Sequence, residues 1–162
     1  MDQWKSFFSK ERGQSLVEFA VSLTILLILV AGIFDGARAL FTYLSLRDAA
    51  QEGALYASID PTNTADIVLR TCQASDLLGG LNCQEASACD SCDVGITVIP
   101  TVSGQLCMGA TDGVAHGIEV TVDYANFPLT MPFIGQLIGR EDTYTVPISA
   151  SVIDTIITPS CP

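Results

Sequence analysis

One carboxylate, that of Glu18, lies near the start of an apolar segment that continues to Phe34. A charged carboxylate in the hydrocarbon of a bilayer costs roughly 2.5 to 3.5 kcal/mol on insertion scales, so this position needs an explanation other than chance. Ahead of the segment lies a short hydrophilic leader that ends at Gly13 and carries three basic residues, Lys5, Lys10 and Arg12. Glu18 is therefore the first candidate for a functional residue.

Six cysteines form the second group of residues with chemistry of their own: Cys72, Cys83, Cys89, Cys92, Cys107 and Cys161. All of them follow the apolar segment, and none lies in the leader. An even number of cysteines on the far side of a membrane segment is typical of structural disulfides in an oxidising compartment. The sequence does not choose among the possible pairings.

Cys89 and Cys92 form a Cys-x-x-Cys motif, which in thioredoxin-like proteins opens a helix after a strand. Here the motif follows a polar stretch, and Asp90 and Asp93 lie beside it. Negative charge near a thiol raises the pKa of that thiol and opposes thiolate chemistry. A structural disulfide is therefore favoured over a redox centre, and a zinc site would need a second close pair of ligands.

Other catalytic or cofactor-binding patterns are missing from the sequence. The single histidine, His116, has no partner that spacing can assign, so no catalytic triad can be proposed. There is no glycine-rich phosphate loop, no pair of catalytic carboxylates and no calcium-loop motif. Asp90, Asp93 and Asp112 leave weak calcium binding open. We therefore predict a protein that is not an enzyme and that needs no cofactor or metal.

The segment from Leu16 to Phe34 is predicted to cross a membrane as a helix. Roughly 20 residues at about 1.5 Å each cover the hydrocarbon layer of about 30 Å. Apolar residues continue at helical spacing beyond it, so one long helix over residues 14–58 is expected, ended by Asp60-Pro61. The basic leader, residues 1–13, places the N-terminus in the cytoplasm by the positive-inside rule and the rest of the chain outside the inner membrane.

Residues 59–162 are expected to form a small, disulfide-stabilised α+β domain with an antiparallel sheet. Thr62 or Thr64 could cap a second helix that ends near Leu78, and residues 82–93 are predicted to be a loop tied by disulfides. Alternation of apolar and polar residues predicts three strands, at 96–99, 118–124 and 143–153.

Net charge limits the partners that the chain can have. The sequence has 7 basic and 18 acidic residues, of which the leader holds three and two; the other four basic and sixteen acidic residues give −12 for residues 14–162. Such a surface repels nucleic acid and anionic lipid. The apolar connection from Phe127 to Gly139 stands out, and it either covers the sheet or forms a contact surface for a partner.

Three stretches of the first part of the chain belong together: Arg12–Ala20 (RGQSLVEFA), Gly32–Arg38 (GIFDGAR) and Ala49–Ala57 (AAQEGALYA). They resemble the N-terminal signature of TadE-like proteins, the minor pilins of the tight-adherence (Flp) subclass of type IV pili. The resemblance implies a minor pilin or pseudopilin that acts in pilus assembly and surface adhesion through helix packing. The cysteine-rich stretch from 72 to 107 has no characteristic counterpart in that family.

The resemblance also implies roles for four residues. Gly13 would be the last residue of the leader and Gln14 the first of the mature protein, after cleavage by a prepilin peptidase. The carboxylate of Glu18 would meet the free amine of Gln14 in a neighbouring pilin subunit. Phe19 occupies a position where the major Flp pilins usually carry tyrosine, so its ring can still pack. Other pilins and pilus assembly proteins are the partners expected on this interpretation.

Two alternatives stay open at the level of sequence. The apolar stretch from Leu23 to Ile33 could be the core of a secretory signal peptide, with Ala37-Arg38-Ala39 as its cleavage site. The glutamate at position 18 and the helical pattern that continues through Ala39 argue against it. A membrane-anchored or secreted domain that binds a partner in the cell envelope, without entering a filament, is the second functional interpretation.

Overall fold

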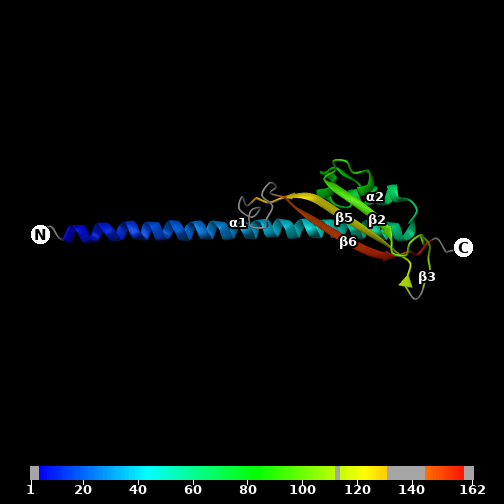
Figure 1. Ribbon diagram of the computed structural model, residues 1–162, viewed down its shortest axis with the longest axis horizontal. Helices are drawn as coiled ribbons and strands as arrows, with labels where there is room; N and C mark the ends of the chain where they lie inside the picture. The colour runs from blue at the N-terminus through cyan, green and yellow to red at the C-terminus, as the bar shows by residue number, and fades with distance from the viewer. Residues whose placement is uncertain (1–3, 112–113, 131–144, 159–162) are drawn as a thin grey trace. The chain divides into compact units, whose positions relative to one another are not determined.

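The computed structural model describes residues 4–111, 114–130 and 145–158, with the backbone alone described for residues 4–12 and Thr111. The chain forms two compact units, residues 1–37 and 38–162. The boundary between them lies inside helix α1 (Trp4–Ile59), which is drawn from blue to cyan in Figure 1. The described residues of the first unit belong to α1 alone, and the second unit contains every other helix and strand.

The first unit presents large apolar side chains on all sides of α1. Every leucine, isoleucine, valine and phenylalanine side chain from Leu16 to Phe34 is exposed in the protomer. A helix that is apolar around its whole circumference is typical of a segment that lies in a membrane or in a core. Within Gly13–Ile59, α1 is long and apolar enough to cross a bilayer.

The corner after α1 is fixed by local hydrogen bonds. The Asp60 amide makes the last helical bond, to the Tyr56 carbonyl at 3.0 Å, and Pro61 cannot continue the ladder. Asn63 then caps α2 (Thr64–Gln73), its side chain accepting from the Asp66 amide at 3.3 Å. The cap is thus an asparagine and not one of the two threonines expected from the sequence.

The expected second helix divides into two. Helix α2 ends at Gln73, and a short helix α3 (Asp76–Gly79) follows with Ser75 as its N-cap. Ser75 is extended, and its hydroxyl accepts from the Leu77 amide at 3.3 Å. A serine that bonds the backbone in this way favours a new helix start over continuation of the old helix.

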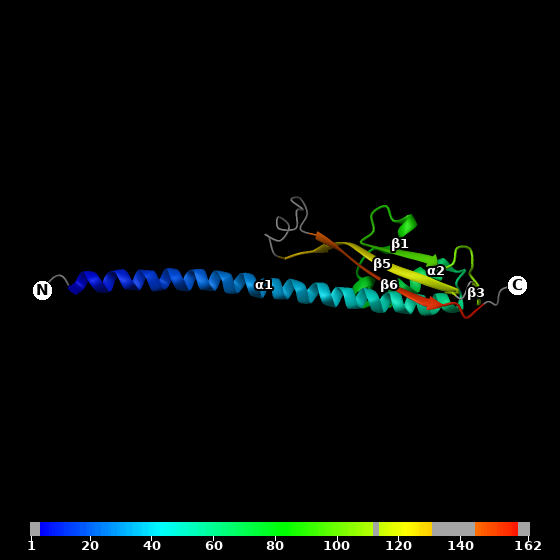
Figure 2. The same cartoon turned by 60° about the horizontal axis from the view of Figure 1, so that its bottom comes forward.

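A four-stranded sheet fills the second unit, in the order β1-β2-β5-β6. Its strands are β1 (Cys83–Glu85), β2 (Val94–Pro100), β5 (Gly117–Pro128) and β6 (Thr145–Thr155). Strands β2, β5 and β6 are antiparallel neighbours, whereas β1 is parallel to β2. A 3₁₀ turn η1 (Ala86–Ala88) follows β1, and β3 (Ala110–Thr111) pairs with β4 (Val114–Ala115) in a separate hairpin. Figure 2 shows the sheet beside the cyan part of α1.

The α+β class is confirmed, and so is the predominantly antiparallel sheet. The parallel strand β1 is a correction, because Cys83–Glu85 falls in the stretch that was expected to be a loop. The three predicted strands correspond to β2, β5 and β6; β2 and β5 are longer than their alternating stretches, and β6 ends two residues later than predicted. Strand β5 continues beyond Tyr124 through a register shift before Phe127, which the strict alternation rule does not anticipate.

One stripe of α1 in the second unit is buried against the sheet. Its buried side chains recur three and four residues apart: Leu46, Ala49, Ala50, Ala54 and Ala57. They form one core with the inward-facing residues of β2 and β5, namely Val94, Ile96, Ile118, Val120 and Val122. At Gly53 an added Cβ would lie 3.3 Å from Val120 Cγ1 and would overlap the Thr71 hydroxyl, so the helix and its neighbours approach closely there.

Candidate functional site

Glu18 lies on the exposed surface of α1 in the first unit. Around it, the side chains of Leu16, Val17, Ala20, Val21, Thr24 and Ile25 line a shallow apolar groove. The Thr24 hydroxyl donates to the Ala20 carbonyl at 2.9 Å, so it needs no outside partner. In the described part of the chain, the Glu18 carboxylate has neither a hydrogen bond nor an ion pair. Any group that compensates its charge must come from outside these residues.

Gly13, Gln14 and Phe19 are placed on the same stretch of helix. Gly13 and Gln14 lie inside α1 and are exposed, and an added Cβ at Gly13 would meet nothing within 4 Å. The Phe19 ring is 67% exposed, next to the Glu18 position. The helix therefore presents the Gly13-Gln14 bond, the carboxylate and the ring within about two turns.

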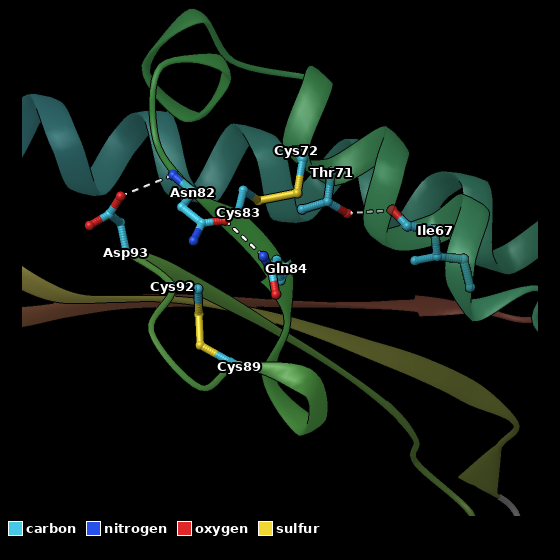
Figure 3. The surroundings of a disulfide bond; sticks show 9 residues. All are labelled: Ile67, Thr71, Cys72, Asn82, Cys83, Gln84, Cys89, Cys92 and Asp93. Atoms are coloured by element: carbon cyan, nitrogen blue, oxygen red, sulfur yellow. Dashed lines mark hydrogen bonds between the residues drawn. A yellow bond between two sulfur atoms is a disulfide. The ribbon is translucent and has the colours of Figure 1, made fainter.

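The first disulfide joins Cys72 of α2 to Cys83 of β1, with a Cα–Cα distance of 5.9 Å (Figure 3). Both half-cystines pack against the hydrophobic core. Beside them, the buried Thr71 hydroxyl donates to the Ile67 carbonyl at 2.8 Å, which satisfies it without a further partner. This bridge holds the edge strand β1 to the helix that covers it.

The second disulfide joins Cys89 to Cys92 and closes the turn between η1 and β2. The neighbouring Asp93 carboxylate accepts from the Asn82 amide at 3.0 Å, so it helps to fix this turn (Figure 3). The motif follows the end of a 3₁₀ turn and does not open a helix, so it lacks the N-terminal dipole that lowers thiol pKa values in redox motifs. Its position fits a structural bridge.

The structure describes only one of the other two cysteines. Cys107 is also disulfide-bonded. Cys161 lies outside the described residues. In the described residues there is no free cysteine, and no group of three or more histidine, cysteine, aspartate or glutamate side chains could hold a metal ion. Of the weak calcium candidates, Asp112 is outside the described residues.

His116 has a structural position that the sequence did not reveal. Its side chain is 4% exposed, and Nδ1 lies 3.0 Å from the Cys107 carbonyl oxygen. Its backbone amide donates to the Gly109 carbonyl, and its carbonyl accepts from the Ile156 amide at 2.9 Å. The histidine therefore ties the segment around Cys107 to the end of β6.

Arg38 was not singled out by the sequence either. It is the first residue of the second unit, and its guanidinium donates to Thr130 Oγ1 at 2.8 Å and lies 5.4 Å from the centre of the Phe127 ring. The ring is itself 3% exposed. Phe127, the start of the apolar connection, is therefore buried beneath Arg38, while residues 131–139 of that connection lie outside the described residues.

A polar groove lies between α1 and α2 in the second unit, lined by Asp48, Glu52, Arg70, Gln73 and Ala74. Nearby, the Tyr56 hydroxyl donates to an Asp66 carboxylate oxygen at 3.4 Å, and the Arg70 guanidinium stacks on the Tyr56 ring at 5.4 Å. Partial burial raises the pKa of Tyr56 above its ordinary value of 10.0, and Asp66 and Asp60 raise it further, against Arg70. These contacts of Tyr56 connect the end of α1 to α2.

These features describe a chain with one N-terminal helix that is long and apolar enough to cross a membrane, followed by a disulfide-bonded α+β domain. Residues 13–55 match the family model described as "TadE-like protein". The resemblance seen in the sequence is thereby confirmed over these residues. The match covers most of α1 and none of the sheet. No curated protein and no solved structure gave a match.

Proposed function

We propose that this protein is a minor pilin of a tight-adherence pilus system, acting in assembly and adhesion by helix packing and not by catalysis. In this proposal, residues 1–13 are a cytoplasmic leader and residues 16–34 of the helix 14–58 cross the inner membrane. Residues 59–162 form the extracytoplasmic domain. A prepilin peptidase cuts after Gly13, and other pilins and assembly proteins are the partners of the mature chain.

The observation that carries the proposal is Glu18 on an exposed, apolar helix. Its carboxylate has no partner in the described part of its own chain, and burying it alone in hydrocarbon is costly. A free N-terminal amine at Gln14 of a neighbouring processed subunit would carry the opposite charge. Pairing the two would offset the cost of burying both groups.

Phe19 supports the same interface. Its exposed ring adds apolar area beside Glu18, where a second helix would cover it. Phenylalanine has no hydroxyl, so this position contributes packing and no hydrogen bond. The pairing at Glu18 would then set where two helices meet, and the ring would fill the space between them.

The alternative is a cell-envelope binding domain that does not enter a filament, either anchored by the helix or released after Ala39. One observation favours it: the match to TadE-like proteins ends before the disulfide-bonded domain begins. Release after Ala39, however, would separate Arg38 from Phe127 and Thr130 and would cut inside α1. An anchored domain is therefore the stronger form of this alternative.

The mass of the mature chain, extracted from membranes of cells that contain the pilus machinery, tests the proposal. We expect a chain that begins at Gln14. Gly13→Val should block this cleavage, because a branched side chain replaces the glycine next to the cut bond. Gly36→Val is the matched control, since an added Cβ at Gly36 also meets nothing within 4 Å. A mature chain that begins at Leu40 would refute the pilin proposal.

A further inference from the structure

The direction of β5 determines which end of the sheet contacts Arg38, the first residue of the second unit. At its start, the His116 carbonyl accepts from Ile156, and the next amide, of Ile157, donates to the Ser58 carbonyl at 2.9 Å. At its end, Phe127 and Thr130 contact Arg38. Strand β5 therefore runs from the end of α1 back to residue 38, over roughly 37 Å at about 3.4 Å per residue.

Arg38, which contacts this end of the sheet, is separated from the proposed membrane span by only a few residues of chain. Arg38 is four residues after Phe34, and four residues of helix rise about 6 Å. Even a fully extended chain of four residues reaches only about 14 Å. The headgroup layer on each side of a bilayer is about 5 to 7 Å thick. Arg38 and the β5 residues that it contacts would therefore lie at the depth of the headgroups.

The side chains at this end suit a lipid surface. Leu40 and Phe41 of α1 are 60% and 69% exposed. At the end of β5, Pro128 is exposed as well. Aromatic and aliphatic side chains beside an arginine are the composition that favours the membrane interface.

Charge sets this end apart from the rest of the domain. The net charge predicts repulsion of residues 14–162 as a whole from anionic lipid. However, no acidic residue occurs from Gly36 to Arg47 or from Tyr124 to Arg140. Each of these two stretches ends in a basic residue. In sequence, the chain after Thr130 is also apolar as far as Gly139.

From these observations we infer that the domain has a second membrane contact: the end of β5 at Pro128, with Leu40 and Phe41, rests on the phospholipid headgroups of the bilayer that holds α1. The inference rests on the proposed span at residues 16–34. The β3–β4 hairpin that carries Val114, at the start of β5, takes no part in this contact.

Tryptophan quenching in the full chain tests this contact. The sequence has one tryptophan, Trp4, so a Trp4→Phe background gives a silent chain. Pro128→Trp is placed in this background, because Pro128 is exposed and has no amide to lose. Val114→Trp is the matched control, 58% exposed in the β3–β4 hairpin that precedes the start of β5. Ile25→Trp reports the span itself.

The proteins are reconstituted in phosphatidylcholine vesicles that carry a nitroxide either on the headgroup or at mid-chain. We expect the headgroup nitroxide to quench Pro128→Trp several times more strongly than Val114→Trp, and the mid-chain nitroxide to quench Ile25→Trp. Leu129→Trp repeats the measurement should Pro128→Trp misfold. Equal, weak quenching at 128, 129 and 114 with strong quenching at 25 would overturn the second contact and leave the span standing. Absence of quenching at 25 would overturn both.

Discussion

The two parts of helix α1 use apolar residues in opposite ways. From Leu16 to Phe34 the side chains are large and exposed around the whole circumference, whereas from Leu46 to Ala57 a stripe of mostly small side chains is buried. Large exposed side chains favour an apolar environment, which the described part of the chain does not supply. Small buried ones bring the helix backbone close to its own sheet. The same secondary structure thus depends on external partners in one unit and on internal partners in the other.

Loss of the disulfide that joins α2 to β1 should give the largest change in the second unit. Cys72→Ala with Cys83→Ala should lower the free energy of unfolding of the domain by about 2 to 5 kcal/mol, because a native crosslink is lost. The Cys89→Ala, Cys92→Ala pair is the matched control. Cys89 and Cys92 have a sequence separation of 3, whereas Cys72 and Cys83 have one of 11. Loss of the Cys89–Cys92 disulfide should therefore lower the free energy of unfolding by about 1 kcal/mol less.

Denaturant unfolding of the full chain in detergent measures both pairs, with near-ultraviolet circular dichroism for the packing of the domain and far-ultraviolet circular dichroism for the helices. The helical signal of the first unit should persist in each variant, since all six cysteines lie after it. A larger loss for the Cys89, Cys92 pair than for the Cys72, Cys83 pair would contradict this account of the core.

Glycine substitution compares the two units directly. Gly53→Val should destabilise the domain by about 1 to 3 kcal/mol or more, because the new side chain meets Thr71 and Val120 in a packed core. Gly36→Val, in the first unit, has open space around it and should leave the unfolding of the domain unchanged. Thermal unfolding of both variants checks this, and similar melting temperatures would show that α1 is not tightly packed at Gly53.

Arg38→Ala should have a smaller effect. It removes the stacking on Phe127 and the bond to Thr130, and we expect a loss of about 1 to 2 kcal/mol in domain stability. Arg47→Ala is the control, since Arg47 is exposed on the same helix. Hydrogen exchange at the end of β5 should increase for Arg38→Ala alone; equal exchange in both variants would show that Arg38 does not hold that strand.

The smallest expected effect is a dependence of stability on alkaline pH. The folded domain raises the pKa of Tyr56, so the unfolded chain loses this phenolic proton at a lower pH than the folded one. Ionisation of Tyr56 should therefore leave the free energy of unfolding unchanged below about pH 9 and should lower it as the pH rises through 10. Tyr56→Phe should make this fall shallower in unfolding curves at pH 9 to 11. An identical slope in both proteins would refute the assignment.

Local patterns were enough to predict the elements whose signal is long and regular. The spacing of Ala50, Gly53, Ala54 and Ala57 predicted the helix, and the alternation around Val120 and Val122 predicted β5. Strand β1 was not predicted, because three residues in a polar stretch are too few to show an alternating pattern. Only the parallel pairing with β2, such as that of Cys83 with Val94, defines this strand.

The contacts of the candidate sites were predicted less completely. Glu18 and the cysteines stood out by type and position. The contact of Arg38 did not, because its partner Thr130 is 92 residues away in the sequence and the residues around neither position indicate the contact. His116 likewise acquires its role from the carbonyl of Cys107, which only the folded loop brings near. Processing at Gly13 and pairing at Glu18 remain predictions.

The most direct test of external partners for the first unit is crosslinking in cells with Glu18→Leu. Removing the carboxylate removes a costly charge from hydrocarbon, so the protein should stay in the membrane fraction. Crosslinking to other pilus components, and surface pili with them, should be lost because no partner for a neighbouring amine remains. Glu52→Leu, an exposed carboxylate of the second unit, is the control and should crosslink normally. Normal crosslinking and piliation in Glu18→Leu would contradict the account.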